Sequence, residues 1–371
     1  MNPEDYAIVI GIENYSSLPV LSDATKDATQ FARWLQDPVG GGLDEKKIRL
    51  ILSPPQIPTP PKRHEPYKEL IDEAFTSFKI LATKGRVGRR LYFYFSGHGY
   101  GQDDDLGMFM VEASEDQANL NIGLRHYRNF LMRWGFWDEI VFILDCCRTS
   151  DYDAIPQHPS FTLRPPFPTP PPPVEDFVAF ATLNGTPSFN TWDESQGRKR
   201  GILTKALLEG LADKAVDGLG RITASSLGKY IKDRVPVIAK DNQVEQGAQH
   251  TTPHEEIIFK ENIIITRKVG VAIPSATSQL IIWTGDFIRI AQYTFNNATG
   301  NWDFIYITAE PKLMIAVRSG NKITKEGNDT IIWIDFQQGG MYGLQPIPGD
   351  PRPLDLREEQ KEAGDFIFKA Y

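Results

Sequence analysis

The feature of this chain that most restricts its fold is a series of short, almost purely apolar runs. A strand has this composition when both of its faces are covered, as in a parallel sheet between layers of helices. Segments with apolar residues at helical spacing separate the runs. Strands that alternate with helices predict an α/β fold with a mostly parallel sheet flanked by helices. The expected strands are 6–12, 48–52, 91–95, 139–144 and 177–181, and the expected helices are 23–35, 67–83, 203–211 and 224–232.

The pattern changes after residue 260, where helical periodicity stops. Short apolar runs separated by Gly, Asn and Asp turn signals predict an all-β unit, either a sandwich or a small barrel. We therefore expect three parts: a first domain at 1–260, a C-terminal β-rich domain of unknown role at 261–348, and a proline- and charge-rich tail at 349–371. The expected strands of the β-rich domain are 280–283, 287–293, 304–307, 313–317 and 331–334.

Composition excludes several classes of protein. The 40 basic and 48 acidic residues give a net charge of −8, which argues against a dedicated nucleic-acid binder. No uncharged apolar run approaches the roughly 18 residues that a membrane helix needs. The N-terminal segment Met1–Asp5 is acidic, whereas a secretion signal begins with basic residues. We expect a cytoplasmic protein with no nucleic-acid or membrane partner.

The chain has two cysteines, Cys146 and Cys147, and they are neighbours. Adjacent cysteines rarely bridge each other, because the ring that they would form is strained. A disulfide framework and a four-cysteine zinc site are excluded. A buried thiol, a reactive thiol or one of each remains, while adjacency disfavours a redox switch between the two.

Residues with catalytic chemistry follow two of the expected strands. His98 lies in Phe95-Ser96-Gly97-His98-Gly99, and the cysteines lie in Asp145-Cys146-Cys147-Arg148. The carboxyl ends of parallel strands meet at one edge of a sheet, where open α/β folds bind their ligands. A nearby imidazole deprotonates a thiol and makes it a nucleophile. The sequence therefore predicts a Cys–His catalytic site if the two strands are neighbours.

These motifs resemble the caspase-like clan of cysteine peptidases (peptidase C14-like), closest to its bacterial and metacaspase-type members. The likeness extends in order over residues 1–260, through the motifs at 21–28, 95–99, 145–147, 201–210 and 249–253. The resemblance implies a caspase-like fold and makes Cys147 the nucleophile and His98 the base. It implies an oxyanion hole from the backbone N–H groups of Gly99 and Cys147, with Cys146 as a packed neighbour.

The resemblance also implies a specificity. Metacaspase-like relatives cleave after Arg or Lys with an acidic first pocket, and the matching positions here are Asp27, Ser96 and Asp145. Carboxylates make charge-assisted contacts to a guanidinium. Caspases that cut after aspartate instead carry an arginine just before the first strand, where this chain has Glu4-Asp5. We expect an endopeptidase whose partners are protein or peptide substrates with a basic residue before the cleaved bond.

One departure leaves a second hypothesis open. The group usually continues from its nucleophile with His-Ser-Gly, whereas this chain has Arg148-Thr149-Ser150. The altered turn is the best support for the alternative, a catalytically inert homologue that acts as a scaffold or sensor. The β-rich domain is expected to bind a regulatory partner or to restrain the site.

Two charged clusters carry weaker hypotheses. Arg198, Lys199 and Arg200 lie in an expected polar loop, and are either a solvated cluster or a self-cleavage site for an enzyme that prefers basic residues. Asp103, Asp104 and Asp105 are weak calcium candidates, because they lack the ligand spacing of an EF-hand. We expect no obligate cofactor, with calcium left open.

Overall fold

The computed structural model describes most of residues 4–261 and, beyond them, mainly strands. The chain divides into two compact units, Met1–Val216 with Ile222–Glu261, and Asp217–Arg221 with Asn262–Tyr371. Asp103, Asp104 and most of the tail at 349–371 lie outside the described residues. The described residues are 4–55, 65–79, 86–102, 105–150, 154–161, 173–194, 196–261, 263, 267–273, 277–284, 289–294, 302–308, 312–319, 329–335, 340–342 and 368–370.

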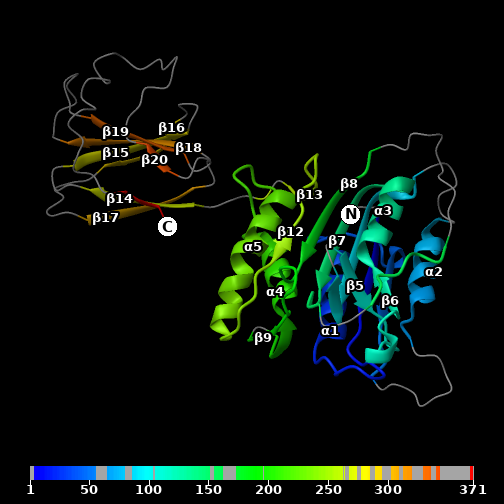
Figure 1. The fold of residues 1–371 in the computed structure, drawn as a ribbon. Helices are drawn as coiled ribbons and strands as arrows, with labels where there is room; N and C mark the ends of the chain where they lie inside the picture. Colours follow the sequence, from blue (N-terminus) through cyan, green and yellow to red (C-terminus); the bar gives the residue numbers. More distant parts are fainter. Residues whose placement is uncertain are drawn as a thin grey trace. The chain divides into compact units, whose positions relative to one another are not determined.

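Six strands form the central sheet of the first unit, in the order β12-β8-β7-β3-β1-β2 (Figure 1). Five run parallel, and the short β12 pairs antiparallel with β8 at one edge. The mostly parallel sheet expected from the apolar runs is confirmed. Its strands are β1 (Asp5–Gly11), β2 (Ile48–Leu52), β3 (Gly88–Ser96), β7 (Trp137–Asp145), β8 (Glu175–Phe180) and β12 (Gln249–His250).

Helices cover both faces of this sheet (Figure 1). On one face, Ile8 of β1 packs in a core with Phe75 of α2 and Tyr127 of α3. On the other, Phe31 of α1 stacks on Tyr94 of β3 with ring centroids 4.8 Å apart. Because successive residues of a strand point to opposite faces, two covered faces explain the continuous apolar runs. The helices are α1 (Ala24–Gln36), α2 (Lys68–Lys79), α3 (Leu124–Trp134), α4 (Ile202–Glu209) and α5 (Ala224–Asp241).

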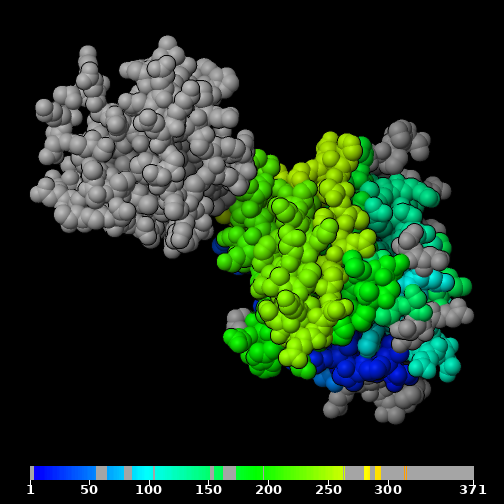
Figure 2. Space-filling model, turned by 60° about the vertical axis from the view of Figure 1, so that its left-hand side comes forward, coloured from blue at the N-terminus to red at the C-terminus, as the bar shows by residue number. Residues whose placement is uncertain are grey.

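The segment from β9 (Asn190–Asp193) to β13 (Ile258–Lys260) completes the face of the first unit that carries α1. Figure 2 shows its side chains, in green and yellow, over much of one side of that unit. The helix expected at 224–232 is longer than expected, since α5 continues through Pro236 to Asp241. None of the helices in the described part of the chain combines the length and the hydropathy needed to cross a bilayer.

Several short elements of the first unit were not expected from the sequence. The helix α3 and a three-stranded antiparallel sheet follow His98, and a two-stranded hairpin precedes α4. The strands are β4 (Gly99–Gln102), β5 (Asp105–Phe109) and β6 (Asn121–Gly123), the hairpin strands β9 (Asn190–Asp193) and β10 (Arg198–Gly201), and the pair β11 (Ile222–Thr223) and β13 (Ile258–Lys260). Short helical turns are η1 (Glu45–Lys47), η2 (Glu115–Gln117) and η3 (Gly210–Lys214).

The described strands of the second unit form two antiparallel sheets, ordered β17-β14-β21 and β16-β15-β18-β19-β20. In the larger sheet Ile282 of β15 pairs with Ile315 of β18, and both side chains are buried. The strands are β14 (Arg267–Ile273), β15 (Thr277–Thr284), β16 (Arg289–Thr294), β17 (Trp302–Thr308), β18 (Lys312–Ser319), β19 (Asp329–Asp335), β20 (Gly340–Tyr342) and β21 (Phe368–Ala370).

Candidate active site

The segments that carry His98 and Cys147 leave the sheet side by side. Their strands β3 and β7 are neighbours, and Ser96 is in register with Asp145. A Cβ atom built on Gly99 would lie 2.8 Å from Cys146 Sγ and 2.9 Å from the Cys147 carbonyl oxygen. The backbone after His98 therefore runs directly against the two cysteines. Only glycine allows an approach this close.

His98 is half-buried and is held by one loop that follows β1. Its backbone N–H donates to the Tyr15 hydroxyl at 2.7 Å, and its Nε2 lies 2.7 Å from the Pro19 carbonyl oxygen. A carbonyl only accepts, so this contact assigns the proton to Nε2 and leaves Nδ1 as the basic nitrogen of the neutral ring. Burial lowers the pKa of His98, and the Pro19 carbonyl partly offsets this. The lowered pKa favours the neutral form of the ring.

The two cysteines have different environments. Cys147 is half-buried, and its Sγ accepts the Ser188 N–H at 3.2 Å. A backbone N–H directed at sulfur stabilises a thiolate. Cys146 is only 2% exposed, and burial raises its pKa well above the ordinary range of a thiol. Cys147 is therefore the more accessible thiol, whereas Cys146 is a packed side chain.

Arg148, which departs from the usual sequence after the nucleophile, points into the protein and is 5% exposed. Its guanidinium donates to Gln249 Oε1 at 2.9 Å and lies 4.3 Å from the centroid of the Phe180 ring. Its backbone N–H donates to the Thr186 carbonyl at 3.1 Å. These contacts tie the turn after Cys147 to β12 and to the 182–186 loop. Arg148 therefore supports the turn that follows Cys147.

The three residues expected in an acidic pocket are all buried. Asp27, Ser96 and Asp145 are 1%, 5% and 6% exposed. Asp27 Oδ2 accepts the Gly201 N–H at 2.7 Å, and Asp145 Oδ2 accepts the Thr204 N–H at 3.0 Å and the Thr204 hydroxyl at 2.6 Å. Both carboxylates therefore meet the backbone at the start of α4. A side chain at Gly201 would collide with the Asp145 carboxylate.

The carboxyl groups of Asp27 and Asp145 differ in the causes of their pKa shifts and in their cationic partners. Burial, and after it the charge of the nearby Asp145, raise the pKa of Asp27 to about 7, against the lowering effect of its contacts with Gly201 and Arg198. Burial also raises the pKa of Asp145, against its hydrogen bonds to Thr204. Asp27 forms an ion pair with Arg198, whereas no cation among the described residues forms one with Asp145. Of the two carboxyl groups, Asp145 is the one without a cationic partner in the described part of the chain.

The cluster Arg198, Lys199 and Arg200 lies in a paired strand and not in the expected polar loop. Strand β10 pairs antiparallel with β9 throughout its length. Arg198 donates to Asp27 at 2.9 Å, and Arg200 forms an ion pair with Asp193 at 2.8 Å. Arg200 is 5% exposed, while Lys199 is exposed. The two arginines are partners of buried acids, because β10 lies against α1.

Of the expected calcium candidates, only Asp105 lies within the described residues. Its Oδ1 accepts the N–H groups of Leu106 and Arg125, each at 2.8 Å, and its side chain is buried. Asp105 thereby anchors the first turn of α3. The described part of the chain contains no group of three or more His, Cys, Asp or Glu side chains arranged to hold a metal ion.

Sequence reasoning missed the side chains that support the candidate pair. Tyr15, Pro19 and Ser188 contact His98 or Cys147, but each is at least 41 residues away in the chain from the residue it contacts. The one available signal was the position of Tyr15 shortly after the first strand, on the edge where ligands bind.

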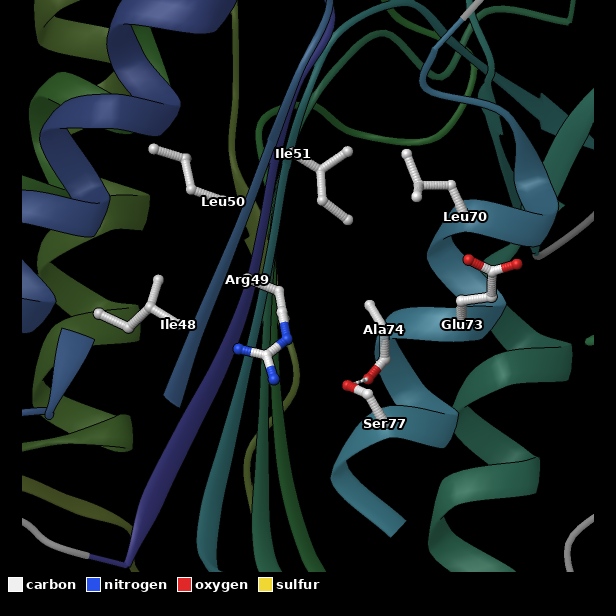
Figure 3. Close-up of a pocket in the computed structure, with 8 residues that line it drawn as sticks. All are labelled: Ile48, Arg49, Leu50, Ile51, Leu70, Glu73, Ala74 and Ser77. Carbon is white, nitrogen blue, oxygen red and sulfur yellow. Dashed lines mark hydrogen bonds between the residues drawn. The ribbon is translucent and has the colours of Figure 1, made fainter. Parts of the chain in front are cut away.

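A separate hollow lies between β2 and α2, away from the cysteines (Figure 3). Arg49 and Ile51 point from β2 toward α2, and Ile48 and Leu50 point to the opposite side of the sheet. The sheet order places β1 between β2 and β3, so this hollow is not part of the Cys147–His98 site. Its lining is Ile48, Arg49, Leu50, Ile51, Leu70, Glu73, Ala74 and Ser77.

Comparison with known proteins places the chain in a family. Residues 4–256 match the family model described as the caspase domain. A probable protease of a Desulfuromonadales bacterium is 29% identical over 218 residues, which are 56% of this chain and 26% of that protein, so most of that relative's length is not covered. Among solved structures, caspase-1 from Spodoptera frugiperda has a TM-score of 0.44 at 13% identity, over 70% of this chain and 91% of that one. The structure of pro-sf-caspase-1 has a TM-score of 0.40 at 13% identity, over 67% and 91%. Because the family model covers well over half of the 371 residues, this chain belongs to the caspase-domain family.

Proposed function

We propose that this protein is a cysteine endopeptidase in which Cys147 is the nucleophile and His98 the general base. The observation that carries the proposal is the pairing of β3 with β7, which brings the His98 and Cys147 segments together at the carboxyl edge of the sheet. The different environments of Cys147 and Cys146 support the choice between the cysteines. The family match supports peptide hydrolysis as the chemistry.

The proposed reaction has two stages, formation of a thioester at Cys147 and its hydrolysis. His98 Nδ1 takes the proton of the Cys147 thiol, and the thiolate adds to the substrate carbonyl carbon. The backbone N–H groups of Gly99 and Cys147 stabilise the oxyanion. The intermediate collapses to a thioester as His98 protonates the leaving amine, and a water molecule activated by His98 then releases the acid product. The Pro19 carbonyl keeps the proton on Nε2 throughout and fixes the orientation of the ring.

We further propose that the residue before the cleaved bond is Arg or Lys, recognised by Asp145 and Asp27 with Ser96 beside them. A buried carboxylate without a cationic partner is stabilised when a guanidinium or ammonium group enters. Asp145 provides this environment. Asp27 lies close enough to Asp145 for the Asp145 charge to raise the pKa of Asp27. A substrate aspartate would instead add a third acid to the same buried region.

The direct test is cleavage of fluorogenic peptides that end in Arg, Lys or Asp, with and without calcium. We expect cleavage after Arg and Lys and at most trace cleavage after Asp. Preferential cleavage after Asp would leave the peptidase in place and overturn the acidic pocket. If no peptide is cleaved, an arginyl chloromethylketone decides between the proposal and an inert scaffold. Stoichiometric labelling of Cys147 supports a latent enzyme, and no labelling supports the scaffold.

Self-cleavage at Arg198, Lys199 or Arg200 would require β10 to separate from β9, because proteases bind extended and unpaired segments. We therefore expect the purified chain to remain intact while this hairpin is folded. The variant Arg200→Gln loses the ion pair with Asp193 and should be cut next to Lys199, as fragment masses would show. The double variant Arg200→Gln with Cys147→Ala is the control and should stay intact. Rapid cutting of the unchanged chain at this strand would contradict the prediction.

For the second unit we propose that its two antiparallel sheets pack as a β-sandwich. Its residues include no cysteine. We therefore assign the peptidase reaction to residues 1–260 and a regulatory role, partner recognition or restraint of the site, to residues 261–348.

A further inference from the structure

We propose that Tyr15 is a positioning residue for His98: its hydroxyl fixes the backbone of the histidine segment, and its ring shields the imidazole from water. This inference rests on the proposed function of His98. It concerns a residue that makes no bond in the reaction and acts through its contacts with the histidine.

Tyr15 lies in the loop after β1, next to the end of β3. Gly11, the last residue of β1, is in register with Ser96, and the Ile12 N–H donates to the Ser96 carbonyl at 2.9 Å. The loop then returns over the His98 segment. Tyr15 is 5% exposed within it. The pairing of β1 with β3 therefore sets the position of the tyrosine relative to the histidine.

Three contacts join Tyr15 to the histidine segment. The hydroxyl accepts the His98 backbone N–H at 2.7 Å. The tyrosine ring lies with its centroid 4.8 Å from that of the imidazole, at an interplanar angle of 58°. A Cβ atom at Gly97 would lie 2.5 Å from the Tyr15 hydroxyl oxygen. The phenol therefore occupies the space that a side chain at position 97 would need, and the residue before His98 is a glycine. The phenol thus fixes both the backbone and one face of the ring.

The loop that carries Tyr15 is itself anchored. The Ser16 N–H donates to the Val111 carbonyl at 2.9 Å, and the Leu21 N–H donates to the Glu13 carbonyl at 2.9 Å. Pro19, whose carbonyl contacts His98 Nε2, belongs to the same loop. One short segment therefore holds the main chain of the histidine through Tyr15 and its imidazole through Pro19. The loop determines where Nδ1 points.

Two substitutions separate the hydroxyl from the ring. Tyr15→Phe removes the acceptor of the His98 N–H and keeps the ring. Tyr15→Leu removes both and exposes the imidazole to water. Burial is the largest cause of the lowered pKa of His98, so loss of the ring should bring that pKa back toward the ordinary value of histidine. The hydroxyl should affect the position of the ring and not its pKa.

The experiment measures peptide cleavage and His98 itself. In Tyr15→Phe we expect kcat to fall about fivefold to tenfold with KM within about twofold, because misplacement of a base acts on the chemical step. In the Cys147→Ala background, an NMR titration should show the pKa of His98 unchanged by Tyr15→Phe and raised by Tyr15→Leu. Exchange of the His98 backbone amide with solvent should rise in Tyr15→Phe. The full-length chain is used throughout.

Tyr127→Phe is the matched control, because it also removes a buried hydroxyl, whose partner is Asp72 and not a residue of the histidine segment. We expect it to lower the melting temperature and to leave kcat and His98 unchanged. If Tyr15→Phe behaves like Tyr127→Phe, Tyr15 is merely structural and the inference is overturned. A KM that rises by the same factor as kcat falls would also overturn it. So would an exchange rate of the His98 backbone amide that does not change in Tyr15→Phe. The NMR measurements need no activity, so a failure of the proposed peptidase function would be distinguished from a failure of this inference.

Discussion

Replacing Cys147 with alanine should lower kcat/KM for an arginyl peptide by at least about a thousandfold, because the variant has no nucleophile to form the thioester. Cys146→Ala should leave the same quantity within about threefold, although the two cysteines are adjacent. The difference follows from their surroundings. Cys147 Sγ is half-buried beside the Ser188 N–H, whereas Cys146 is buried and its pKa is held far above neutrality.

The same pair of variants controls for folding. Cys146 packs in the core, so Cys146→Ala should cost stability, about 1 kcal/mol in the free energy of unfolding. Cys147→Ala should unfold at nearly the melting temperature of the unchanged chain, since its side chain is partly exposed. Alkylation followed by peptide mapping gives an independent readout, with Cys147 labelled first. Activity retained in Cys147→Ala, or labelling confined to Cys146, would rule out the assigned nucleophile.

The central sheet was predictable because its signal is local. A strand buried on both faces is apolar at every position, and β1 and β7 show this in their own residues. The small sheet β4-β5-β6 carries no such signal, because its strands have three to five residues and include several glycines. The helix α3 was also not anticipated, although Leu124, Tyr127 and Leu131 form its buried side.

The sequence predicted which strand ends carry the candidate site, but not the residues that contact His98, Cys147 and the buried acids. His98 and Cys147 follow strands that the sequence assigned to one parallel sheet, so their proximity was predicted on the condition that these strands are neighbours, as β3 and β7 are. Their supporting contacts are non-local: Tyr15 is 83 residues from His98, and Arg198 is 171 residues from Asp27. For this reason the arginines of β10 were expected in a polar loop, as either a solvated cluster or a self-cleavage site. A charge run in the sequence gives no sign of a buried acid on another element.

The variant Asp145→Asn should change the preference for the residue before the cleaved bond more than the variant Asp27→Asn does. Asp27 is already paired with Arg198, whereas Asp145 has no cationic partner among the described residues. A charge-assisted hydrogen bond contributes about 1.5–3 kcal/mol, and each 1.4 kcal/mol is a factor of ten. We expect the ratio of kcat/KM for an arginyl over a glutaminyl peptide to fall about a hundredfold in Asp145→Asn and about tenfold in Asp27→Asn.

Both variants should fold. In Asp27→Asn the partners of the lost carboxylate keep other contacts, since Arg198 still donates to Gln30 and Arg200 is still paired with Asp193. In Asp145→Asn the amide oxygen can still accept from Thr204. Asp72→Asn is the matched control, because Asp72 is a buried carboxyl group of α2 that accepts the Tyr127 hydroxyl and does not belong to the Asp27–Asp145 pair. It should lower stability without changing the arginine-to-glutamine ratio.

The same ratio should depend on pH in a way that identifies Asp27. With its pKa raised to about 7, Asp27 is neutral below that pH and negative above it, while the substrate arginine stays charged. The preference for arginine should therefore increase as pH rises through 7. Titration of Cys147 and His98 affects both peptides alike and cancels in the ratio. Asp27→Asn should abolish this increase. Asp145→Asn should keep an increase but move it to lower pH, because the Asp145 charge no longer raises the pKa of Asp27. A preference that is flat with pH in the unchanged chain would exclude Asp27 from the pocket.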